Sequence, residues 1–93
     1  MRAIVTVLGQ DQVGIIASVC TKLAEESVNV LDINQTILDG YFTMVMLVDT
    51  SACQTPFGEL ATKMEAFGKV FDQTQSLSIL MQREDIFNAM HRI

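Results

Sequence analysis

The chain has 93 residues, enough for one hydrophobic core and too few for two, so we expect a single domain over residues 1–93. Hydrophobic residues make up 49% of the sequence and charged residues 18%, which excludes a disordered or low-complexity chain. Six Lys and Arg against eleven Asp and Glu give a net charge of -5, which argues against the basic surface that nucleic acids and anionic membranes attract.

The cysteines and the apolar runs indicate the compartment. Cys20 and Cys53 have no CxxC spacing, and a chain this apolar needs no disulfide scaffold, so we expect free thiols in a reducing environment. Polar residues 10–12 interrupt the apolar N-terminal run before a signal-peptide core can form. No run approaches the roughly 18 apolar residues of a membrane span. We therefore expect a cytoplasmic protein with no membrane partner.

The first two elements are a strand and a helix. Residues 2–8 are rich in β-branched side chains and stop at Gly9, which predicts a strand followed by a turn. Asp11 then precedes a segment, 14–28, whose apolar residues recur at helical spacing, and its carboxylate is well placed to cap the free amides. The expected buried stripe of this helix consists of Ile15, Ile16, Val19, Cys20, Leu23 and Ala24. We expect Cys20 to be a buried packing residue of that stripe.

A hairpin follows. Residues 30–38 alternate, with Leu31, Ile33 and Ile37 on one face, which predicts a strand that is wet on its other face. The next pair, Asp39 and Gly40, is typical of a type I′ turn, and an almost continuous apolar run, 41–48, comes after it.

The remaining elements are a helix, a strand and a tail. Thr55 and Pro56 supply a cap and a first-turn proline for a helix that we expect to run from residue 57 until Gly68 ends it. Residues 74–82 alternate as a fourth strand. The tail, 84–93, has apolar residues along one side of a short helix: Ile86, Phe87, Met90 and Ile93.

This order predicts an α+β fold, the ferredoxin-like βαββαβ sandwich, with two helices on one face of a four-stranded antiparallel sheet, a core over 1–83 and a short C-terminal helix over 84–93. The strands 2–8 and 41–48 are apolar on both faces, so they should be central. Because helices cover only one face, a subunit partner or the tail helix must cover the other. We expect a homodimer, with its sheets either side by side or face to face.

The sequence lacks the residues that several kinds of metal, catalytic and nucleic-acid site require. His91 stands alone in the tail, far in sequence from both cysteines, so neither a structural zinc site nor a Ser, His and Asp triad is expected. The loop 9–14 is acidic and has no Arg to hold a phosphate, and it has no CxxC to hold a metal. Only Tyr41 and Phe42 place aromatic rings on strands, which is weak support for stacking RNA bases. We expect no catalytic residue, no metal and no cofactor.

Two segments remain as candidates for a site, the loop 9–15 and the start of the second strand, 29–33. The loop opens a helix N-terminus, whose free amides and positive dipole end suit a carboxylate ligand, and Gly14 permits close approach. The alternative is architectural: Asp11 only caps, Gly14 only allows tight packing, and Asn29 only makes a turn. The residues by themselves leave both interpretations open.

The sequence resembles the ACT domain family over about its whole length. The resemblance lies in Gly9-x-Asp11-x-x-Gly14-Ile15 after the first strand and in Asn29-Val30-x-Asp32-Ile33-x-Gln35 at the second. It is greatest to small stand-alone bacterial members that end in a segment like 86–93, which are also similar to the repeats of the glycine cleavage system transcriptional repressor.

The resemblance implies a non-enzymatic regulatory module that senses an amino acid at a subunit interface. By motif match, the ligand-binding residues are Gly9, Asp11, Gly14, Ile15 and Asn29, with Asn29 contributed by the neighbouring subunit. Asp11 departs from members that carry a neutral amide there, and Gly9 offers no side chain. A docking module that acts on a metabolic enzyme or a transcriptional regulator without any ligand stays open as the alternative.

Overall fold

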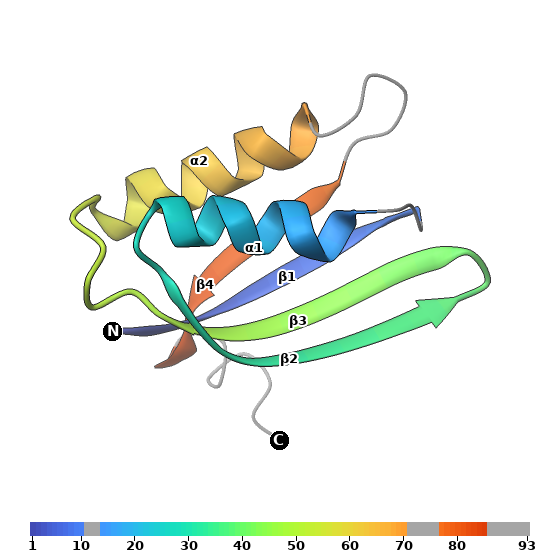
Figure 1. The fold of residues 1–93 in the computed structure, drawn as a ribbon, viewed down its shortest axis with the longest axis horizontal. Helices are drawn as coiled ribbons and strands as arrows, with labels where there is room; N and C mark the ends of the chain where they lie inside the picture. Colours follow the sequence, from blue (N-terminus) through green and yellow to red (C-terminus); the bar gives the residue numbers. More distant parts are fainter. Residues whose placement is uncertain (11–13, 71–76, 86–93) are drawn as a thin grey trace.

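The computed structural model describes residues 1–10, 14–70 and 77–85 of the chain (Figure 1). Four strands and two helices follow one another as β1 (Arg2–Gln10), α1 (Ile15–Glu25), β2 (Asn29–Leu38), β3 (Tyr41–Asp49), α2 (Phe57–Lys69) and β4 (Ser78–Arg83). Both helices lie on the same face of the sheet (Figure 1). The expected βαββαβ order is therefore confirmed. The predicted tail helix falls mainly on 86–93, which lie outside the described residues, as does Asp11.

The sheet has the order β2-β3-β1-β4, with every neighbouring pair antiparallel. The two strands that are apolar on both faces, β1 and β3, are the central ones, as the sequence predicted. Residues directly opposite each other share a face of the sheet. Val5 pairs with both Met46 and Met81, so these three side chains point towards the helices. This is the ferredoxin-like arrangement.

The hydrophobic core lies between the sheet and the two helices. Its buried residues come from every element except β2, whose Val30 is partly buried and packs against the core. They are Ala3, Val5, Val7, Ile15, Val19, Leu23, Val28, Phe42, Met44, Met46, Val48, Leu60, Met64, Leu77, Ile79 and Met81. Burying one Val, Leu, Ile, Phe or Met side chain contributes about 1.5–3 kcal/mol, so this layer stabilises the fold. Cys20 is half-buried rather than buried, because it lies at the margin of the stripe, beside the fully buried Val19.

The hairpin between β2 and β3 turns at Asp39 and Gly40. Their φ angles are 51° and 83°, and the flanking residues Leu38 and Tyr41 pair. Two central residues with positive φ define the type I′ turn, which confirms the prediction. The strand β2 departs from expectation in two ways. Leu31 is the extra residue of a bulge, and the strand is exposed along almost its whole length because it lies at the edge of the sheet.

The helix boundaries also differ from those predicted. The helix α1 ends at Glu25 rather than 28, because Ser27 takes a φ of 60°, which no helix continues. Thr55 does not cap α2; its hydroxyl hydrogen-bonds to Glu26 Oε1 at 3.4 Å. Gly68 lies inside α2 instead of ending it, because it is where that helix packs on β4, and the Leu77 amide donates to its carbonyl at 2.8 Å.

Candidate functional site

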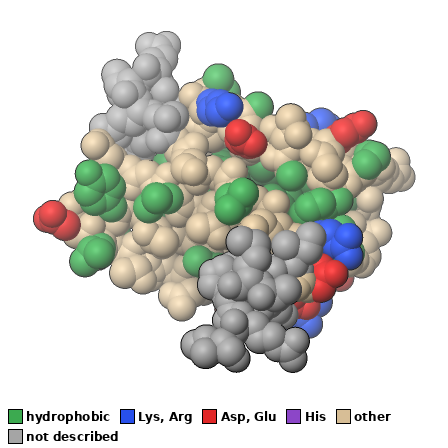
Figure 2. All heavy atoms as spheres, turned by 180° about the vertical axis from the view of Figure 1, so that it is seen from behind, with side chains coloured by type: hydrophobic (Ala, Val, Ile, Leu, Met, Phe, Trp, Pro, Cys, Tyr) green, Lys and Arg blue, Asp and Glu red, His purple; other side chains and the backbone are tan. Residues whose placement is uncertain are grey.

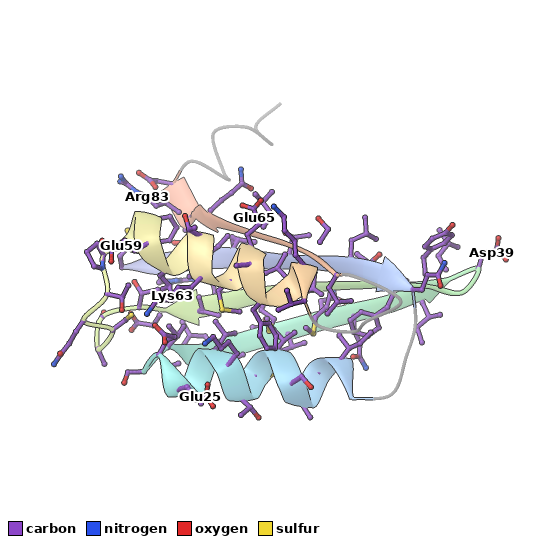
Figure 3. The ribbon with its side chains drawn as sticks, turned by 90° about the horizontal axis from the view of Figure 1, so that it is seen from above. Glu25, Asp39, Glu59, Lys63, Glu65 and Arg83 are labelled. Carbon is purple, nitrogen blue, oxygen red and sulfur yellow. The ribbon has the colours of Figure 1, made fainter. Side chains whose placement is uncertain are left out.

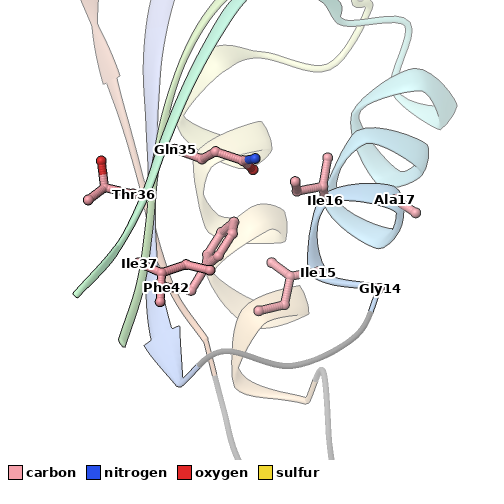
Figure 4. A pocket seen from close by; sticks show the side chains of 8 residues that line it. All are labelled: Gly14, Ile15, Ile16, Ala17, Gln35, Thr36, Ile37 and Phe42. Carbon is pink, nitrogen blue, oxygen red and sulfur yellow. The ribbon is translucent and has the colours of Figure 1, made fainter. Parts of the chain in front are cut away.

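A groove opens between the N-terminal turn of α1 and the hairpin end of β2 and β3. We call it the α1–β2 groove. Its volume is about 570 Å³. It is lined by Gly14, Ile15, Ile16, Ala17, Gln35, Thr36, Ile37 and Phe42 (Figure 4). The groove exists because the hairpin half of β2 is exposed, and no described residue fills the space between it and the first turn of α1. Most of its walls are apolar, as is usual for sites that hold small molecules.

One end of the groove is the N-terminus of α1. Gly14 is the N-cap residue, with a φ of 89° that favours glycine, and it has no side chain of its own with which to cap the helix. The first helical hydrogen bond runs from the Ser18 amide to the Gly14 carbonyl at 2.9 Å. The amides of Ile15, Ile16 and Ala17 therefore precede the helical ladder. Amides in this position, together with the helix dipole, form a binding site for an anion or a carboxylate.

Gln35 is the polar side chain of the groove. It pairs with Met44, whose side chain is in the core, so it lies on the helix-facing side of β2. Figure 4 shows its amide group extending across the groove towards α1. Gln35 is not among the site residues predicted from the sequence. The sequence does contain a signal for this residue: Gln35 is a polar residue at a position that alternation places on the same face of the strand as Ile33 and Ile37.

Ile16 is a second residue whose role the sequence pattern missed. It was expected in the buried stripe of α1, yet it is exposed and lines the groove, whereas its neighbour Ile15 is buried in the core. The stripe is narrower than predicted because Ile16 points towards the uncovered edge strand β2 (Figure 4). Together with Ile37 and Phe42, Ile16 forms an apolar wall.

The predicted site residues fall into two groups. Gly14 and Ile15 line the groove, and Gly9 pairs with Phe42, another of its lining residues. Asn29 lies at the opposite end of the sheet, where it is exposed and pairs with Asp49. Asn29 also alternates with Val30, which packs against the core, so the Asn29 side chain belongs to the face away from the helices. Within one chain the structure therefore separates Asn29 from the groove.

The described lining of the groove carries no titratable groups. None of its described side chains could act as a general acid or base near pH 7. Among the described residues, no cluster of His, Cys, Asp and Glu side chains could hold a metal ion. No helix in the described part of the chain has the length and hydropathy to cross a membrane.

The charges nearest Asn29 belong to a separate, structural cluster. Asp49 accepts hydrogen bonds from the Ser51 hydroxyl at 2.5 Å and the Ser51 amide at 2.9 Å, and it lies 3.6 Å from the N-terminal ammonium of Met1. The Ser51 hydrogen bonds, assisted by that ammonium, lower the pKa of Asp49 from its ordinary value of 3.8. The cluster ties the start of β1 to the end of β3.

A model of the ACT domain matches residues 2–81, which is most of the chain. The chain belongs to the ACT domain family. A UPF0237 protein of Listeria innocua is 47% identical over 93 residues, with the whole of both chains covered. The ACT domain of this chain thus has relatives of its own length.

Solved structures support the same assignment. An ACT domain protein from Streptococcus pneumoniae superimposes with a TM-score of 0.80 at 43% identity, covering 98% of each chain. A structure described as a glycine cleavage system transcriptional repressor gives a TM-score of 0.62 at 22% identity. It covers 87% of this chain and 44% of its own, and at that identity it shows the shared fold alone.

Proposed function

We propose that this ACT domain is a non-catalytic regulatory module that binds a small amino acid at an interface between two subunits. The observation that carries the proposal is the α1–β2 groove, which joins helix N-terminal amides that precede the helical ladder to an apolar wall and one amide side chain. Membership of the ACT family supports a regulatory, ligand-binding role. We further propose that the domain acts in the cytoplasm without a cofactor, with Cys20 and Cys53 as free thiols.

The groove offers a partner for each part of an α-amino acid. The amides of Ile15, Ile16 and Ala17 suit the carboxylate, because a charged acceptor at a helix N-terminus is favoured by both hydrogen bonds and the dipole. The carbonyl oxygen of Gln35 suits the ammonium group. The exposed wall of Ile16 and Ile37 suits an aliphatic side chain, which makes an apolar amino acid the expected ligand class.

The subunit interface of the proposal uses the free edge of β2. This strand has ten residues, its outer edge is unpaired in one chain, and Ile33 and Ile37 are exposed beside the groove. An unpaired edge strand readily pairs with another chain. When two copies of β2 pair about a two-fold axis, the strands run antiparallel, and Asn29 of one copy meets the Leu38 end of the other. This pairing would bring the backbone of the partner subunit's Asn29 beside the hairpin end of β2, with its side chain on the sheet face opposite to the groove.

A thermal-shift screen of the twenty amino acids tests the proposal. A ligand present at about 100 times its dissociation constant adds about 2.7 kcal/mol to the free energy of unfolding, so an aliphatic amino acid should raise the melting temperature clearly. The Gln35→Ala variant should bind about 2- to 10-fold more weakly, because one hydrogen bond contributes about 0.5–1.5 kcal/mol. The Gln54→Ala variant is the matched control. It makes the same change at an exposed loop position that does not line the groove, so it should bind the amino acid normally.

Two further variants test the assigned residues. Asn29→Ala should weaken binding about 2- to 10-fold if the partner subunit donates this side chain, while folding is unaffected because Asn29 is exposed. A bulky residue at Gly14 should abolish binding and also destabilise the fold, because of the positive φ there. No stabilisation by any amino acid would contradict the proposal and favour a ligand-free docking module that acts on an enzyme or a transcriptional regulator.

A further inference from the structure

The sheet face that points away from the helices has an apolar centre. Cross-strand pairing assigns to this open face the side chains of Ile4, Leu8, Val45, Leu47 and Leu80. Leu8 and Leu80 are 48% and 53% exposed. Figure 2 looks onto this face and shows hydrophobic side chains spread across it. A row of directly paired residues, Asn34, Val45, Thr6 and Leu80, crosses the middle of the sheet.

Charged groups avoid the middle of the open face. Most of the residues interleaved with its aliphatic side chains are neutral, among them Thr6 and Thr43, whereas Asp32 pairs with Leu47. Its carboxylates in the described part of the chain, Asp32 and Asp49, lie at the end where β2 begins. Other charges lie on the helices or at the ends of the sheet, and those labelled in Figure 3 are Glu25, Asp39, Glu59, Lys63, Glu65 and Arg83. In a chain of net charge -5, the open face is where a second copy meets the least like-charge repulsion.

The size of the open face suits a stable contact between copies. Four strands about 4.8 Å apart, with eight or nine residues at about 3.3 Å rise, give a face of roughly 550 Å². Two such faces together bury about 1,100 Å², just above the roughly 1,000 Å² that a specific interface needs. Sheets of this kind pack face to face at about 10 Å with aliphatic side chains interdigitated.

We propose that the open face binds the open face of a second copy, forming a two-sheet sandwich with the helices on the outside. The contact is self-complementary, because the same neutral, aliphatic surface faces itself across a two-fold axis. It is separate from the β2 edge. An edge-paired dimer keeps both open faces on the same side of one continuous sheet, which doubles the apolar surface. Where the edge pairing of the proposed function also holds, the assembly has four chains with two kinds of interface.

Sedimentation velocity at about 0.15 M salt tests the proposal on the full-length protein. Val45→Lys places a charge at the centre of the open face, and the particle mass should fall to half that of the unchanged protein. Val70→Lys makes the same change at an exposed position at the end of α2 and should leave the mass unchanged. Circular dichroism establishes that each variant is folded. Leu80→Lys, at a more exposed position on the same face, replaces Val45→Lys if that variant does not fold.

The outcomes separate this proposal from the proposed function. If neither Val45→Lys nor Leu80→Lys changes the particle mass, the open-face contact between copies is wrong. That result would mean that something other than a second copy covers this surface. A monomeric unchanged protein overturns it as well. Ile37→Lys, on the groove side of β2, should reduce amino-acid binding without separating the open faces. The two proposals can also fail separately. If Val45→Lys halves the particle mass while neither the unchanged protein nor any variant binds an amino acid, the open-face contact is supported and the proposed function is contradicted.

Discussion

At the scale of single residues, Gly68 marks a close approach of helix α2 to the sheet. A Cβ atom at this position lies 2.5 Å from the backbone carbonyl oxygen of Leu77 and 3.0 Å from the Ile79 side chain. A backbone oxygen cannot move aside as a flexible side chain can. Glycine is therefore required here for packing, although its backbone angles are helical.

We expect Gly68→Ala to lower the free energy of unfolding by about 1–3 kcal/mol, because the added methyl group forces α2 away from β4. Gly58→Ala is the matched control. It lies in the same helix with no atom within 4 Å of its Cβ position, and alanine there should stabilise the helix by up to about 1 kcal/mol. Urea denaturation of both variants measures the difference. Equal stability of the two would contradict the close packing of Gly68.

Asp49 supplies a test of electrostatics at the same scale. Its pKa is lowered first by the Ser51 hydrogen bonds, so the folded state binds its proton less readily than the unfolded state does. This group therefore stabilises the fold above the ordinary pKa of 3.8, and the stabilisation is lost as the pH falls through the lowered value. The side chain is partly exposed, which keeps the effect small.

We expect the pKa of Asp49 to rise in Ser51→Ala, while the remaining Ser51 amide bond keeps it below 3.8. An NMR titration of the carboxyl group measures this directly. Ser78→Ala, at an exposed position of β4, is the control and should leave the pKa of Asp49 unchanged. An identical pKa in the unchanged protein and Ser51→Ala would show that the hydroxyl does not stabilise the carboxylate.

At the scale of elements, α1 has two roles on two sides. Leu23 is fully buried in the core, whereas Ile16 is exposed and lines the groove. We expect Leu23→Ala to lower the free energy of unfolding by about 2–5 kcal/mol. Ile16→Ala should lower it by well under 2 kcal/mol, because its side chain loses little burial, yet it should weaken binding of an aliphatic amino acid. Calorimetric melting and titration of both variants check this. A larger loss of stability in Ile16→Ala than in Leu23→Ala would contradict the division.

The sequence could predict the elements because each carries its own local signal. Alternation, helical spacing, the β-branched and apolar runs, and the Asp39 and Gly40 pair predict all six elements and the turn without tertiary information. Details that depend on contacts with residues distant in the sequence could not be predicted. The bulge at Leu31 is set by pairing with β3, and Gly68 ended the predicted helix because nothing in the sequence shows that β4 lies against it.

The candidate site was predictable in part for the same reason. Gly14 and Ile15 follow from the start of a helix, which is a local feature. Gln35 could not be selected, because its importance depends on which face of β2 looks towards α1 and on how far α1 leaves that strand uncovered. Asn29 was assigned by family resemblance to a neighbouring subunit, and that assignment stays a prediction.

At the scale of the whole molecule, the fold buries one face of its sheet and leaves two surfaces for other molecules. The first is the β2 edge with the groove beside it, and the second is the open face. Their chemistry differs: the groove combines amides with an apolar wall, while the open face is aliphatic and neutral at its centre. A small ligand fits the first surface and a second sheet fits the second.

NMR mapping of amide shifts on ¹⁵N-labelled protein tests the central claim most directly, with an aliphatic amino acid identified by the thermal screen as the titrant. The largest shifts should fall on the backbone amides of Ile15, Ile16 and Ala17 and on the side-chain amide of Gln35, and they should saturate with one ligand per chain. Residues of α2 should not respond. A response centred on α2 or on the open face, or no response to any of the twenty amino acids, would contradict the account.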